Sequence, residues 1–132
     1  MVTVSTFEDL ESWKFARKLV REVYEVTSSH PFARDFGLRD QLRRAAVSVM
    51  ANIAEGFESR TDGLFIEYLG RAKGSAGEVR AHLYVALDAG FISRDRFCRM
   101  SDHTQQASRC ISGLMSYLKA HRRPINRKPT AG

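Results

Sequence analysis

Proline, cysteine and long apolar runs are scarce in this chain of 132 residues. The three prolines stand at positions 31, 124 and 129, so none interrupts the body after its first loop, and long helices are permitted. No apolar run reaches the ~18 residues that a membrane helix needs. The amino-terminal MVTVSTFEDL also lacks the basic start and apolar core of a signal peptide. We therefore predict no membrane association.

The two cysteines, Cys98 and Cys110, are too few for a disulfide framework. On a single helix their faces would lie about 120° apart, so we predict two thiols and a reducing, cytoplasmic compartment. Metal binding by a helix bundle would require Glu-x-x-His on two helices, and Glu78 and His82 are instead four apart and alone. Zinc spacing, G-x-S-x-G and a Cys–His pair are also missing from the sequence. These absences predict no metal, no cofactor and no enzyme activity.

Positive charge is in excess, with a formal net charge of +6, but it is unevenly distributed. Residues 122–132 contain Arg122, Arg123, Arg127, Lys128 and two prolines, with few apolar residues. Residues 1–121 keep 17 basic and 15 acidic groups, which is near balance. We expect residues 122–132 to be a disordered basic tail, because they have little to pack.

The body of the chain shows helical periodicity throughout and no strand pattern. We expect helices at about residues 7–28, 38–58, 64–89 and 94–121. Their caps are expected at Thr6, at Thr61 or Asp62, and at Ser93, with Gly90 as a carboxy-terminal stop. Short joints between long helices predict an all-α, up-down-up-down antiparallel four-helix bundle formed by residues 1–121.

Two of these helices carry more apolar surface than one core requires. Beside the stripe of the first helix (Leu10, Trp13, Ala16, Val20, Val23) stand Phe15, Leu19 and Val26, and Val47, Met50 and Ala54 flank the stripe of the second. A surface helix needs one apolar stripe, and large exposed apolar patches are unusual for soluble monomers. The surplus predicts a homo-oligomer.

Three stretches resemble a known bacterial family. They are FEDLESWKFARKLV (7–20), FGLRDQLRRAAVSVMANIAEGF (36–57) and RAKGSAGEVRAHLYVAL (71–87), and the ordered motifs ANIAEGF and AKGS make the resemblance specific. The family is that of the S23 or 23S rRNA-intervening-sequence proteins, and the resemblance covers roughly residues 7–92. It implies a left-handed four-helix bundle that assembles as a homopentamer.

A related branch of that family, the accessory proteins of diversity-generating retroelements, forms a basic pentameric barrel that binds a reverse transcriptase and nucleic acid. The resemblance to the family itself implies an unsettled function, and the related branch suggests RNA or DNA as a partner. This chain departs from the family in two places: Met50 stands where proline is frequent, and the basic residues after the AEGF motif are reduced to Arg60, with Glu58 nearby.

Asn52 and Glu55 interrupt the small, apolar stretch SVMANIAEGFESR (48–60) three residues apart, on one side of the second helix. They could form a small-molecule or metal site. We favour a structural role, in which they are a buried or interfacial polar pair and Glu55 meets an arginine of another helix or subunit.

The glycine-rich GRAKGSAG (70–77) fails the P-loop pattern, because Lys73 precedes Gly74, and it lies within a helix. We expect tight helix packing at its glycines.

Basic side chains recur along the helices, and they are the candidate nucleic-acid contacts together with the four cations of the tail. They are Lys14, Arg17, Lys18 and Arg21, then Arg39, Arg43 and Arg44, then Arg71 and Lys73. Such clusters are usually solvated faces, but a symmetric oligomer would multiply each one into a strong field. Two hypotheses follow: a non-enzymatic oligomeric binder of RNA, DNA or nucleoprotein, or a protein–protein scaffold with no nucleic-acid role.

Overall fold

The computed structural model describes residues 4–121. It contains the 3₁₀ turn η1 (Phe7–Asp9), helix α1 (Glu11–Thr27), the 3₁₀ turn η2 (Phe32–Arg34), and helices α2 (Phe36–Phe57), α3 (Asp62–Asp88) and α4 (Arg94–Ala120). No strand occurs within the described residues. The all-α class and the four helices are confirmed, with bounds that differ from the predicted ones by a few residues.

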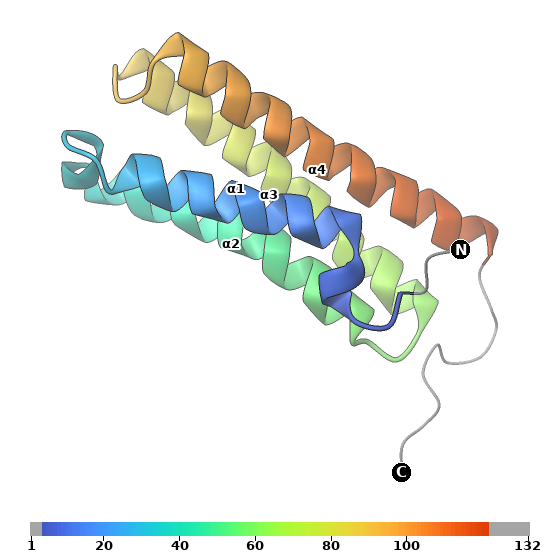
Figure 1. Ribbon diagram of the computed structural model, residues 1–132. Coiled ribbons are helices and arrows are strands. Elements are labelled where there is room, and N and C mark those ends of the chain that lie inside the picture. Colours follow the sequence, from blue (N-terminus) through green and yellow to red (C-terminus); the bar gives the residue numbers. More distant parts are fainter. Residues whose placement is uncertain (1–3, 122–132) are drawn as a thin grey trace.

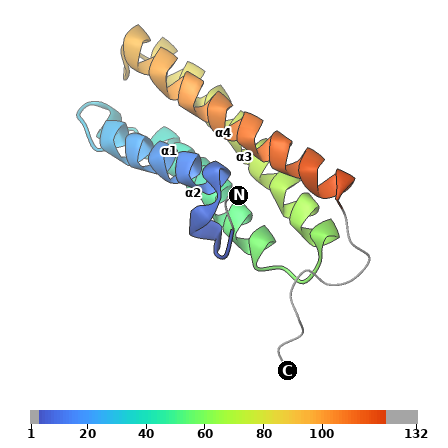
Figure 2. The same ribbon diagram turned by 45° about the vertical axis from the view of Figure 1, so that its right-hand side comes forward.

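The four helices lie side by side around one core (Figure 1). Helix α1 packs against α2 and α4, and α3 packs against the same two helices, with the most extensive contact between α2 and α3. The α1–α2 and α3–α4 connections lie at one end of the molecule, and the α2–α3 connection lies at the other. The turned view in Figure 2 shows the same arrangement of the connections.

Local capping chemistry explains where α2, α3 and α4 begin. The side chains of Asp35, Thr61 and Ser93 each accept a hydrogen bond from a backbone amide three residues later, at 3.0–3.1 Å. Thr61 is therefore the cap of α3, which settles the choice between Thr61 and Asp62. Gly90 has a φ of 77° just past the end of α3 and stops this helix as predicted.

The first predicted helix is divided at Leu10. The Asp9 carboxylate accepts hydrogen bonds from the amides of Ser5 at 3.0 Å and Thr6 at 3.2 Å, which completes a capping box around the short turn η1. These bonds hold the pKa of Asp9 below its ordinary value of 3.8. Leu10 is then extended (φ −73°, ψ 130°) and buried, so α1 begins only at Glu11.

The burial along α1 corrects one prediction. Leu19 and Val26, which we assigned to a flanking stripe free for another subunit, are 0% and 5% exposed in the core of the single chain. Trp13 and Val20, assigned to the core, are only half-buried. The reason is that α1 is covered from two sides, by α2 and by α4, so its buried face is centred between the two predicted stripes.

Apolar surface does remain on the outside of α1 and α2, at the predicted flanking positions of α2 and at one further position on α1. Val47 is 37% exposed and Tyr24 is 44% exposed, while Met50 and Ala54 are half-buried. The surplus apolar surface from which we predicted an oligomer is therefore smaller than expected, and it lies chiefly on α2.

Glycine has opposite roles in α2 and α3. A Cβ on Gly56 would lie 2.8 Å from Phe65 Cδ1 and 2.8 Å from Tyr68 Cβ, so this glycine permits the close approach of α2 and α3. At Gly74 and Gly77 an added Cβ would meet nothing within 4 Å. The tight packing predicted for the GRAKGSAG stretch is therefore wrong within one chain.

Candidate functional site

The outward face of α1 carries four exposed cations, Lys14, Arg17, Lys18 and Arg21. Their spacing of three and four residues places them together on the side of the helix opposite its buried residues. With Glu8 and Trp13 they line a shallow depression of about 510 Å³. Lys14 pairs with Glu11 at 3.3 Å, and within residues 4–121 the other three make no ion pair. This face is a concentrated and largely uncompensated positive surface.

Arg39 and Arg43 of α2 are engaged within the chain. Arg39 donates from Nη1 to the Ala33 carbonyl at 3.1 Å and pairs with Asp40 at 2.9 Å. Arg43 donates from Nε to Thr27 Oγ1 at 2.8 Å and lies with Cζ 4.5 Å from the centre of the Tyr24 ring. These contacts fasten α2 to the end of α1 and to the loop, so both arginines have an intramolecular structural role.

The other predicted cations are dispersed. Arg44 is exposed on α2. Arg71 is exposed on α3, where it pairs with Glu67 at 3.3 Å. Lys73 lies on the α4 side of α3, with Nζ 3.4 Å from Ser108 Oγ. The predicted contacts of the tail, Arg122, Arg123, Arg127 and Lys128, lie outside the described residues.

Asn52 and Glu55 do not pair with each other. Asn52 is half-buried and donates from Nδ2 to the Ser48 carbonyl at 2.8 Å and to Ser48 Oγ at 3.0 Å. Ser48 Oγ lies 2.8 Å from Ser75 Oγ of α3, so this polar group joins α2 to α3.

Glu55 is exposed and has no hydrogen-bond or ion-pair partner among residues 4–121. Its predicted burial within the chain is wrong, because α2 directs this side chain away from its buried face. The alternative of a partner on another subunit remains a prediction.

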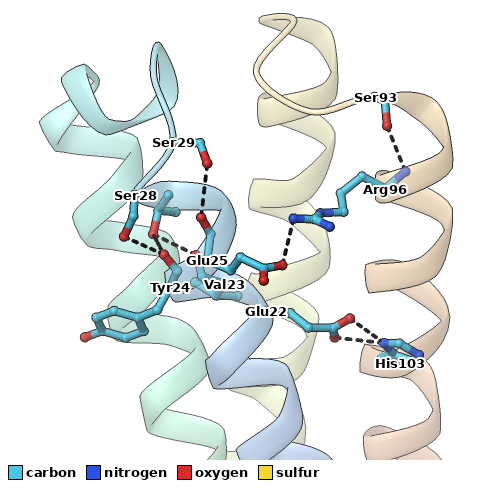
Figure 3. A network of polar contacts seen from close by, with 10 residues as sticks. Glu22, Val23, Tyr24, Glu25, Ser28, Ser29, Ser93, Arg96 and His103 are labelled. Atoms are coloured by element: carbon cyan, nitrogen blue, oxygen red, sulfur yellow. Dashed lines mark hydrogen bonds and ion pairs between the residues drawn. The ribbon is translucent and has the colours of Figure 1, made fainter.

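Polar contacts connect α1 and α4 near the end where α4 begins (Figure 3). His103 Nδ1 lies 2.8 and 2.9 Å from the two carboxylate oxygens of Glu22, and Arg96 donates to Glu25 at 2.9 Å. Glu22 and His103 are each about one-quarter exposed, so the pair is partly shielded from water. The pair was not anticipated from the sequence because its members are 81 residues apart. Its role is to hold the first and last helices together.

A basic groove runs between α3 and α4, with a volume of about 530 Å³. Its α3 side contains Gly70, Lys73, Gly74, Ala76, Gly77 and Arg80, and its α4 side contains Gln105, Ser108, Arg109 and Ser112. Sequence reasoning missed Arg80 and Arg109. The spacing of Lys73, Gly77 and Arg80 by four and three would have placed Arg80 on the same helix face, whereas Arg109 comes from another helix.

The potential metal ligands of the described chain do not gather into one site. No group of three or more His, Cys, Asp or Glu side chains there could hold a metal ion. Cys98 and Cys110 are free, and burial, followed by the charge of Glu11, raises the pKa of the half-buried Cys110 thiol. Residues 4–121 also contain no helix that is both long and apolar enough to span a membrane.

Comparison with known proteins places this bundle in a family. Residues 8–113 match the family described as 23S rRNA-intervening sequence protein. A protein of unknown function from the S23 ribosomal protein family of Bacteroides thetaiotaomicron VPI-5482 has a similar solved structure, with a TM-score of 0.68 over 79% of this chain and 94% of that one. The two are 20% identical, so this likeness concerns the fold. A search of curated proteins finds no match. The family match spans most of the chain, and the chain therefore belongs to the 23S rRNA-intervening sequence protein family.

Proposed function

We propose that the protein is a non-enzymatic accessory protein that binds RNA or DNA through phosphate contacts, without sequence preference. In this proposal it assembles as a homo-oligomer of up-down-up-down antiparallel bundles. The number of five subunits comes from the family resemblance alone.

The observation that carries the proposal is the outward face of α1. Four cations are exposed there, and Arg17, Lys18 and Arg21 have no ion pair within residues 4–121. Symmetric repetition would combine several such faces into a field that attracts a polyanion. The face lies along one helix and offers no module known to read bases, so phosphate contacts are the expected source of affinity.

The first prediction concerns salt. The full chain should bind labelled single-stranded oligonucleotides at ~50 mM salt, and affinity should fall with a log–log slope of ~0.7 for each phosphate neutralised. Fluorescence anisotropy across a salt series measures both quantities. Deleting residues 122–132 removes Arg122, Arg123, Arg127 and Lys128 and should weaken binding and flatten the slope while the fold of residues 4–121 is kept.

Oligonucleotides of unrelated sequence should bind with similar affinity, which is the control for the lack of sequence preference. An absence of binding to both single- and double-stranded nucleic acid at ~50 mM salt contradicts the proposal. The competing function, a protein–protein scaffold, would then be favoured by the apolar surface around Val47 and Tyr24.

The second prediction concerns assembly and Glu55. Light scattering at micromolar concentration should give a multiple of the chain mass of 14.9 kDa. Glu55→Ala should reduce the oligomer mass, because we propose that this exposed carboxylate meets a cation of a neighbouring subunit. In a dissociated chain the free energy of unfolding should change by less than ~0.5 kcal/mol, as is usual for surface positions.

Asp102→Ala is the matched control, since Asp102 is also an exposed helical carboxylate, on α4. Its oligomer mass should equal that of the parent. A monomeric parent protein would contradict the proposed assembly. An unchanged oligomer mass for Glu55→Ala would show that Glu55 does not contribute to the interface.

A further inference from the structure

The groove between α3 and α4 has an unbalanced charge. Lys73, Arg80 and Arg109 line it, and its lining contains no carboxylate. Within the described residues Lys73 reaches only a hydroxyl, that of Ser108 at 3.4 Å, and the buried Nε of Arg80 has no hydrogen-bond partner. A concave wall lined by charge of one sign focuses the electrostatic field on whatever enters it. This one-sided charge suits the groove to an anion.

The glycines of α3 that line the groove, which we call its floor, have open space above them. Gly74 and Gly77 would have nothing within 4 Å of an added Cβ, and Gly70 would have only the end of the Met115 side chain at 3.9 Å. Glycine weakens a helix interior, and packing within the chain does not require it at these positions. Without side chains there, a ligand can approach the helix backbone next to Lys73 and Arg80.

The donors around this floor suit phosphate. Arginine presents several N–H groups in a planar fork that matches phosphate oxygens, and lysine adds a mobile point charge. Ser108, Ser112 and Gln105 contribute further polar groups along the α4 side. The lining contains no aromatic side chain on which a base could stack, so contacts would go to the nucleic-acid backbone.

We propose that this groove binds the phosphate groups of a nucleic-acid strand, as a second contact surface in addition to the outward face of α1. The inference rests on the proposed nucleic-acid function and gives it a site that includes Arg80 and Arg109. A single strand fits the proposal, because a positively charged groove can track the sugar–phosphate backbone of a single strand without reading its bases.

The first test fills the groove without changing its charge. Gly77→Leu places a side chain over the floor, and leucine is a better helix former than glycine, so the fold should be retained. Binding of a single-stranded oligonucleotide at ~50 mM salt should weaken about tenfold, equivalent to about 1.4 kcal/mol. Gly113→Leu is the matched control, because Gly113 also has open space around it but lies on α4 outside the groove lining. It should bind like the parent.

The second test removes charge. The double variant Lys73→Gln/Arg109→Gln should lower the salt slope by about 1.4, because each single-strand phosphate that is no longer neutralised lowers it by ~0.7. The control variant Lys119→Gln/Arg99→Gln has the same net charge as the first double variant. It changes exposed cations that do not line the groove, so its salt slope should stay near that of the parent. Equal decreases in the two variants would assign the effect to net charge and overturn the groove as a site.

The outcomes separate this inference from the function on which it rests. If the parent protein binds no nucleic acid, both the proposed function and the proposed groove site are contradicted. If the parent binds and neither Gly77→Leu nor the double variant changes the binding, only the groove site is contradicted. A loss of oligomer mass in Gly77→Leu would make the groove a contact between subunits. Complete displacement of the oligonucleotide by an equal concentration of inorganic triphosphate would assign the groove to a short polyphosphate. Either result overturns the nucleic-acid assignment.

Discussion

Phe32→Ala should lower the free energy of unfolding by about 3–5 kcal/mol, the usual cost of truncating a buried phenylalanine. Phe32 is 1% exposed and stacks on Phe91, with ring centres 5.0 Å apart. Phe32 lies in the α1–α2 connection and Phe91 in the α3–α4 connection, so the two rings join the loops at one end of the bundle. At roughly 4 °C for each kcal/mol in a domain of this size, the melting temperature should fall by about 12–20 °C.

Phe36→Ala is the matched control, because Phe36 is the same residue type four positions away but is 63% exposed. Its ring lies 4.7 Å from Arg39 Cζ, an exposed cation–π contact. Such contacts contribute about 0.5–1 kcal/mol, so this variant should lose no more than that. Thermal unfolding followed by circular dichroism measures both variants. Similar melting temperatures for the two would show that Phe32 does not close the end of the core.

Gly56→Leu should lower the free energy of unfolding by about 3 kcal/mol relative to Gly113→Leu, at the upper end of typical overpacking costs. The new Cβ would lie 2.8 Å from both Phe65 Cδ1 and Tyr68 Cβ and 3.3 Å from the Phe65 carbonyl oxygen. A ring atom can move aside, but the backbone oxygen and a Cβ move only with α3 itself. Separating α2 from α3 would loosen the most extensive helix contact of the bundle.

The comparison with Gly113→Leu isolates packing from helix propensity. Both substitutions replace a glycine within a helix by leucine, which should favour each helix by up to ~1 kcal/mol. At Gly113 nothing lies within 4 Å of the new Cβ, so that variant should be as stable as the parent or more stable. Urea unfolding of the two variants gives the difference directly. Equal midpoints would mean that α2 and α3 do not require glycine where they meet.

The helices themselves are properties of the sequence. The caps at Thr61 and Ser93 and the stop at Gly90 act through bonds between residues close in the chain, so they can be recognised without tertiary information. The apolar seam of the last helix was also predictable. Its members are Phe97, Met100, Thr104, Ala107, Ile111, Leu114 and Leu118, and all are buried except the half-buried Leu114. A seam that alternates four and three defines one side of a straight helix regardless of its neighbours.

The direction of each helix face was decided only by tertiary packing. Periodicity indicated two stripes on the first helix but not which helices would cover them, and burial of Leu19 and Val26 follows from contact with both α2 and α4. Tertiary packing also decided which cations have a structural role and which line the groove. Arg43 binds Thr27 within the chain, whereas Arg80 and Arg109, 29 positions apart, share one groove.

The sequence by itself therefore determined four helices, the caps at Thr61 and Ser93, the stop at Gly90, the apolar seam of the last helix and membership of a family. Each of these depends on contacts within a few turns of one helix or on the order of the residues. The tertiary structure alone decided that Glu55 is exposed, that Phe32 closes one end of the core, and that the glycines of α3 form the floor of an open groove. Those features depend on how distant helices rotate and pack against one another, and local periodicity does not specify that rotation.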